Sequence, residues 1–108
     1  MMLYSMRDAV TAGSESLTMY CVLIVVDTPG WRASGTRLRA DFTDSAAGND
    51  GTEHIFMDVR DGLLILVLYL RAADLDVARL KAEQLCRRAM AVAIPPDTLW
   101  MIRSTTVL

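Results

Sequence analysis

The pattern of apolar and polar positions is dominated by two runs that are apolar without interruption: Tyr20 to Val26 (YCVLIVV) and Leu63 to Leu70 (LLILVLYL). Continuous runs of aliphatic and β-branched residues at this length are typical of strands that are covered on both faces. We therefore predict that these two runs form the central strands of one sheet.

Two other segments are more amphipathic and are predicted to be edge strands. In the first, alternate positions are apolar, as in a strand with one buried face: Ile55, Met57 and Val59. Asp61-Gly62 follows it directly, and this dipeptide between two strand patterns is a strong hairpin signal. The second amphipathic segment, Thr98 to Thr106 (TLWMIRSTT), is predicted to be the closing strand.

The clearest helix follows the second apolar run, in the sequence LDVARLKAEQLCRRAM. Asp74 is suited to cap its start, Arg87 and Arg88 to lie near its C-terminal end, and Pro95-Pro96 to prevent its continuation. Its apolar stripe at helical spacing is predicted to comprise Leu75, Ala78, Ala82, Leu85, Cys86 and Ala89.

The segment from 31 to 42 fits a helix or a strand. Trp31, Leu38 and Phe42 fall roughly on one helical face, but Leu38 and Phe42 also belong to an alternating pattern. Thr28 as N-cap and Pro29 at the first helical position would start a helix here, so the helix is favoured. The polar stretch 44–51 (DSAAGNDG) is predicted to be a loop.

The resulting order is β-α-β-β-α-β, which predicts an α+β domain over residues 18–108. This order suggests the ferredoxin-like plait, a four-stranded antiparallel sheet with two helices on one face. Its sheet order is fourth, first, third, second, so the two continuous apolar runs would be central. Residues 1–17 are expected to form an N-terminal arm or leader, because the small polar residues of TAGSES end the helical spacing before them.

Composition limits the classes of partner. The chain has 108 residues, 53% of them hydrophobic and 22% charged, and a formal net charge of −2. These values suit one globular domain and give no general attraction to nucleic acid or to anionic lipid. The longest apolar run has eight residues, and Arg7 and Asp8 interrupt the N-terminus where a signal peptide is apolar. We expect a cytoplasmic protein that contacts neither nucleic acid nor membrane.

A plait leaves one sheet face without helices, and here both faces of the central strands are apolar. Soluble monomers rarely leave a large contiguous apolar area exposed to water. A second copy of the chain, residues 1–17 or another protein could cover the face. We expect a homodimer, because two-fold self-association is the most common arrangement.

Few residues suggest chemistry. Cys21 and Cys86 fit buried, reduced thiols, and His54 is the single histidine, which excludes a cluster of histidine ligands. Trp31 and Trp100 could line a pocket, although tryptophan in a small domain is more often part of the core. We predict no catalytic residue, no metal site and no cofactor.

The best local motif is Asp27-Thr28-Pro29-Gly30, between the first strand and the first helix. It resembles the D-x-P-G turn of ACT domains, small regulatory plaits of the same element order. The resemblance implies that Asp27, Pro29 and Gly30, with Trp31 as a neighbouring wall, help bind an amino acid or another small effector at a subunit interface. The chain departs from the family in having Trp31-Arg32 after the glycine, where aliphatic residues are usual.

Three functions are compatible with these features. The leading hypothesis is a non-catalytic module that senses a small molecule or docks on a partner protein. The first alternative is a small dimeric α+β-barrel enzyme, similar to cofactor-independent oxygenases, with an apolar cavity. The second alternative is a structural assembly subunit whose open face binds another chain.

Overall fold

The computed structural model describes residues 17–30, 35–46 and 52–108, and the predicted N-terminal arm lies almost entirely outside them. The elements follow one another as β1 (Thr18–Asp27), α2 (Gly35–Ala46), β2 (Thr52–Arg60), β3 (Leu63–Ala72), α3 (Leu75–Ala93) and β4 (Met101–Val107). The prediction of an α+β domain with a four-stranded antiparallel sheet is confirmed.

The strands lie in the order β2-β3-β1-β4, so the two continuous apolar runs are central, as predicted. β1 and β3 pair along their whole length, from Thr18 opposite Ala72 to Asp27 opposite Leu63. β4 pairs with the other edge of β1, with a change of register between Val25 and Val26.

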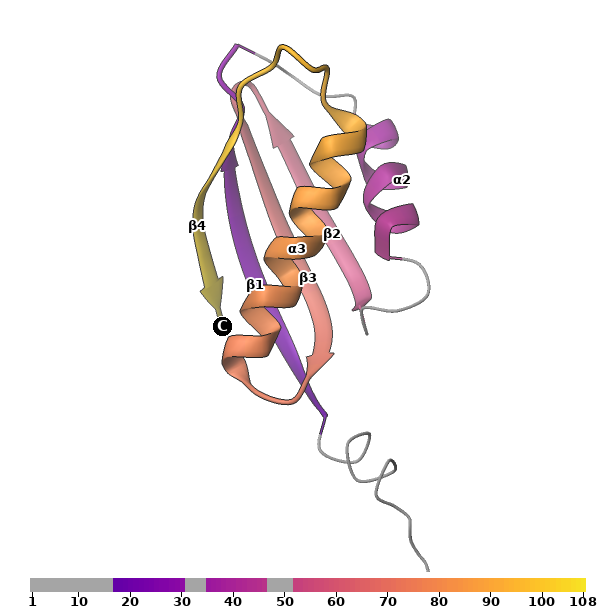
Figure 1. The fold of residues 1–108 in the computed structure, drawn as a ribbon, viewed down its shortest axis with the longest axis vertical. Helices are drawn as coiled ribbons and strands as arrows, with labels where there is room; N and C mark the ends of the chain where they lie inside the picture. Colours follow the sequence, from indigo (N-terminus) through magenta and orange to yellow (C-terminus); the bar gives the residue numbers. More distant parts are fainter. Residues whose placement is uncertain (1–16, 31–34, 47–51) are drawn as a thin grey trace, which may run out of the picture.

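Both helices pack on one face of the sheet, where they cover the core (Figure 1). α3 contacts β1, β3 and β4, whereas α2 lies against β2 and α3. Alternate residues of the central strands point into this layer and are almost completely buried: Val22, Ile24, Val26, Leu64, Leu66, Leu68 and Leu70. The intervening residues of the same strands form the opposite face, which no element of the described chain covers.

α3 begins as the sequence predicted, because the Asp74 carboxylate accepts a hydrogen bond from the Val77 N–H at 2.9 Å. The predicted stripe is wrong at Leu75, the first residue of α3, which is 46% exposed. Met90 extends the stripe instead. The helix continues to Ala93 before Pro95, so Arg87 and Arg88 do not lie in its last turn.

The start of the first helix differs from the prediction. α2 begins at Gly35 rather than after Thr28, because Gly30 has φ +75°, which no right-handed helix can contain. Thr28 is buried, and its N–H donates to the Gly62 carbonyl at 3.0 Å, so it closes the end of the sheet. The preference for a helix over a strand is confirmed from Gly35 onward, with Leu38 and Phe42 in the core. The helix reaches Ala46, so the predicted loop does not begin at position 44.

The remaining turns position the ends of the sheet. Asp61 and Gly62 form the two-residue turn of the predicted β2–β3 hairpin, and Gly62 has φ +72°. β4 begins at Met101, later than the predicted Thr98, because the Thr98 N–H donates to the Pro95 carbonyl at 3.0 Å in a turn.

Candidate functional site

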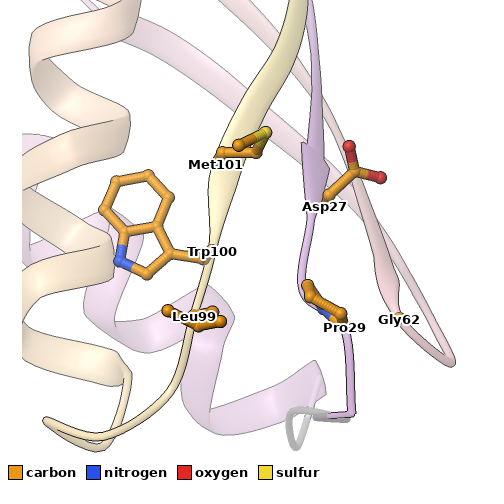
Figure 2. Close-up of a pocket in the computed structure, with 6 residues that line it drawn as sticks. All are labelled: Asp27, Pro29, Gly62, Leu99, Trp100 and Met101. Atoms are coloured by element: carbon orange, nitrogen blue, oxygen red, sulfur yellow. The ribbon is translucent and has the colours of Figure 1, made fainter.

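A cleft of about 430 Å³ lies at the end of β1, beside the D-x-P-G turn and the start of β4 (Figure 2). This volume falls within the range of sites for small molecules, roughly 300–1,000 Å³. The cleft is lined by Asp27, Pro29, Gly62, Leu99, Trp100 and Met101.

Three separate segments meet at the cleft because of the sheet order. Asp27 ends β1 and is the register partner of both Leu63, which starts β3, and Met101, which starts β4. The hydrogen bond from the Thr28 N–H to the Gly62 carbonyl joins the D-x-P-G turn to the β2–β3 turn. Backbone pairing therefore joins the three segments that meet at the cleft.

The walls are mostly apolar. Leu99 and Met101 are 76% and 63% exposed. They therefore present apolar surface at the cleft and do not belong to the hydrophobic core. Trp100 is half-buried and packs against the core; Figure 2 shows its indole projecting away from Asp27. Trp100 therefore combines the two positions considered for it, against the core and at the cleft.

Asp27 supplies the charge at the cleft, and it is paired. The Arg103 Nε and Nη2 atoms donate to the two carboxylate oxygens of Asp27 at 3.1 and 2.5 Å. The hydrogen bond to Asp27, and then its negative charge, raise the pKa of Arg103 above its ordinary value. A guanidinium has five N–H donors, and the Arg103 side chain is 60% exposed, so the two hydrogen bonds to Asp27 do not use all of its donors.

The residues of the ACT-like motif have different outcomes. Asp27 and Pro29 line the cleft, whereas Gly30 is exposed in the adjoining turn and does not line it. Trp31 lies outside the described residues. The sequence analysis did not identify Gly62, Leu99 and Met101 as lining residues. The predicted sheet order nevertheless places the starts of β3 and β4, next to Gly62 and at Met101, on either side of β1.

The open sheet face is a second candidate site. Its centre is apolar, and three rings extend it over β2 and β3: those of His54, Phe56 and Tyr69. Phe56 meets Tyr69 edge to face, with ring centroids 5.9 Å apart at 81°. A hydrogen bond with Cys21, its register partner, raises the pKa of Tyr69.

The two cysteines lie in different environments. Both are free thiols; Cys86 is buried as predicted, whereas Cys21 is half-buried on the open face. Loss of solvation raises the pKa of Cys86 to about 12, so its thiol stays protonated at neutral pH. Within the described ranges, no group of three or more metal-ligating side chains occurs, and neither helix is long and apolar enough to cross a membrane.

Comparison with known proteins assigns no family. No protein-family model and no curated protein matches the chain. Among solved structures, the chain is similar to "De novo designed protein Foldit4", with 14% sequence identity and a TM-score of 0.38 over 82% of this chain and 97% of that chain. A TM-score of this size supports no conclusion about fold or function.

Proposed function

We propose that this chain is a non-catalytic module that binds a small effector in the cleft and works as a homodimer through the open sheet face. The strand order and the position of both helices on one face support assignment to the ferredoxin-like plait. The ACT-like turn supports a regulatory role, because Asp27 and Pro29 both line the cleft.

The chemistry of the cleft favours a small zwitterion with an apolar side chain. An ammonium group can share the carboxylate of Asp27, and a carboxylate can take N–H donors of Arg103 that Asp27 leaves available. The apolar part of such a ligand would pack on Pro29, Leu99 and Met101. Amino acids have this combination, and they are the effectors that the ACT resemblance implies.

A thermal-shift screen of individual amino acids with the full chain tests the proposal. A ligand at ten times its Kd raises the free energy of unfolding by about 1.4 kcal/mol. For a domain of this size, such a change corresponds to roughly 5–10 °C in the unfolding midpoint. If no amino acid shifts the midpoint at millimolar concentration, the effector proposal is wrong.

Variants at the cleft locate the site. Leu99→Ala and Met101→Ala remove exposed apolar wall and should weaken binding several-fold, while the fold persists because both side chains lie largely outside the core. Leu80→Ala is the matched control, since Leu80 is an exposed leucine on α3 that does not line the cleft. Equal loss of binding in all three variants would contradict a site at this cleft.

The apolar open face also favours the assembly-subunit alternative, in which association is the whole function. Both hypotheses require self-association, but only the sensing module requires an effector. The α+β-barrel enzyme needs a polar group inside the cavity between helices and sheet. Of the described residues, Thr28 is the polar residue that is buried as a whole, in the turn at the sheet end, and the hydroxyl oxygens of Thr52 and Thr105 are buried as well.

A further inference from the structure

The open sheet face has an apolar centre built from two cross-strand pairs. Leu23 lies opposite Val67 and Val25 opposite Ile65, and all four side chains are half-buried in the single chain. Paired residues of adjacent strands point to the same face, so these four form one block over β1 and β3.

Phe56 raises a large aromatic side chain at the β2 side of this block. It is the register partner of Val67 and is 55% exposed. Its edge-to-face contact with Tyr69 favours this orientation of the ring. Large aromatic side chains of this kind commonly anchor protein interfaces.

The β4 side of the block carries small polar residues instead. Leu23 lies opposite Thr106 and Val25 opposite Ser104, so Phe56, Val67, Leu23 and Thr106 form one row across the whole sheet. The side chains of this row are therefore large at the β2 end and small at the β4 end.

Charged residues surround the block rather than enter it. On β2, the Arg60 Nη2 atom lies 2.8 Å from the Asp58 carboxylate, with both side chains more than half exposed. The Asp27–Arg103 pair lies at one end of the face. The chain's single lysine, Lys81, is on α3. An apolar, aromatic centre without lysine and with a polar rim is the composition of a protein–protein interface.

We propose that a second copy of this chain packs sheet to sheet on the open face, about a two-fold axis that runs along the strands between β1 and β3. The inference rests on the proposed homodimer and specifies its geometry. Such an axis places β1 over β3 of the partner subunit, which joins the two apolar blocks. It also places Phe56 over Thr106 of the partner subunit, so each large ring meets a small residue.

The size of the face agrees with a dimer. Four strands spaced about 4.8 Å apart, with central strands of ten residues rising about 3.3 Å each, give a face of about 19 by 33 Å. Its projected area of about 600 Å², increased by side-chain relief, approaches the roughly 800 Å² that each partner buries in a standard stable interface.

Light scattering after size-exclusion chromatography tests the geometry with the full chain. The unmodified protein should be a dimer at micromolar concentration. Phe56→Arg and Thr106→Glu should each weaken association at least tenfold, because each places a charge against an apolar or small partner. Leu80→Arg is the matched control, because Leu80 is also 55% exposed but lies on the helical side. It should leave the dimer intact.

The double variant Phe56→Arg with Thr106→Glu is the decisive sample. Within one chain the two positions are separated by three strand spacings, about 14 Å, so they cannot form an ion pair. Under the proposed axis they face each other across the dimer, and association should recover in part. An equimolar mixture of the two single variants should likewise associate more tightly than either alone.

Each of the other possible results contradicts one component of the proposal: the dimer, its surface or its axis. A monomeric unmodified chain excludes the sheet-to-sheet dimer, whichever segment or partner then covers the face. A dimer that neither Phe56→Arg nor Thr106→Glu weakens uses another surface. Weakening by the single variants without recovery in the double variant excludes this axis. The amino-acid thermal shift is measured separately, so loss of the dimer geometry and loss of the effector site are distinguishable.

Discussion

At the scale of single residues, Asp27 holds a structural position and also lies at the proposed effector site. It ends β1, lines the cleft and forms a two-pronged ion pair with Arg103. Exposed ion pairs contribute little to stability, commonly less than about 1 kcal/mol. The pair is therefore better placed to orient charge at the cleft than to hold the fold.

Asp27→Asn separates these two roles. The substitution keeps the shape of the side chain but removes the negative charge, so the free energy of unfolding should fall by less than about 1 kcal/mol. Binding of a zwitterionic effector should weaken about tenfold or more, because its ammonium group loses a charged partner. Urea denaturation and calorimetric titration measure the two effects, with Asp58→Asn as the control at the exposed Asp58–Arg60 pair. Unchanged effector affinity would remove Asp27 from the site.

Cys86 gives a pH-dependent prediction. Its folded pKa of about 12 lies above the ordinary thiol value, so at pH 9–12 the unfolded chain releases this proton and the folded chain retains it. Stability from this group is therefore complete below about pH 8.5 and is lost as pH rises, by up to about 1.4 kcal/mol per unit. The difference in unfolding free energy between the unmodified chain and Cys86→Ala, measured from pH 8 to 10.5, should shrink with increasing pH. A constant difference would contradict the prediction.

At the scale of elements, α3 depends on a cap that the sequence shows directly. Asp74→Ala removes the acceptor for the Val77 N–H and should lower the free energy of unfolding by about 1 kcal/mol. The midpoint of thermal unfolding should fall by roughly 4–8 °C. Asp76→Ala, in the same helical turn, is the control and should cost only a few tenths of a kcal/mol, since it loses a dipole interaction alone. Equal effects would mean that charge, and not the cap, stabilises the start of α3.

The elements show which structural features can be predicted from sequence. The central position of β1 and β3 follows from two-sided apolar runs, and the hairpin follows from Asp61-Gly62. The start of α2 could not be inferred in this way, because Thr28 and Pro29 are also suitable for a helix N-terminus. The left-handed φ of Gly30 excludes a helix there, and the hydrogen bond from the Thr28 N–H to the Gly62 carbonyl joins this turn to a segment far away in the sequence.

At the scale of the whole molecule, the same limit applies to the cleft. Asp27 and Pro29 could be predicted because they belong to a local motif, whereas Leu99 and Met101 become neighbours of that motif only when β4 pairs with β1. Their contribution depends on where β4 begins, and the sequence pattern placed that start three residues too early. The cleft residues outside the D-x-P-G motif therefore depend on the pairing of distant strands, which a local sequence pattern does not contain.

The alternation of residues along β1 and β3 links fold stability to assembly. One set forms the core beneath the helices, and the other forms the proposed dimer interface. Because only folded chains associate into the dimer, the midpoint of thermal unfolding must rise with protein concentration. The midpoint of the unmodified chain should therefore increase by several degrees between about 1 and 100 µM, whereas that of Phe56→Arg should stay nearly constant. Leu68→Ala leaves a cavity at a fully buried core position, so it should lower the unfolding midpoint at every concentration. The increase of the midpoint with protein concentration should remain the same as in the unmodified chain. If the unfolding midpoint of the unmodified chain does not depend on protein concentration across this range, a second copy does not cover the open face of the folded chain.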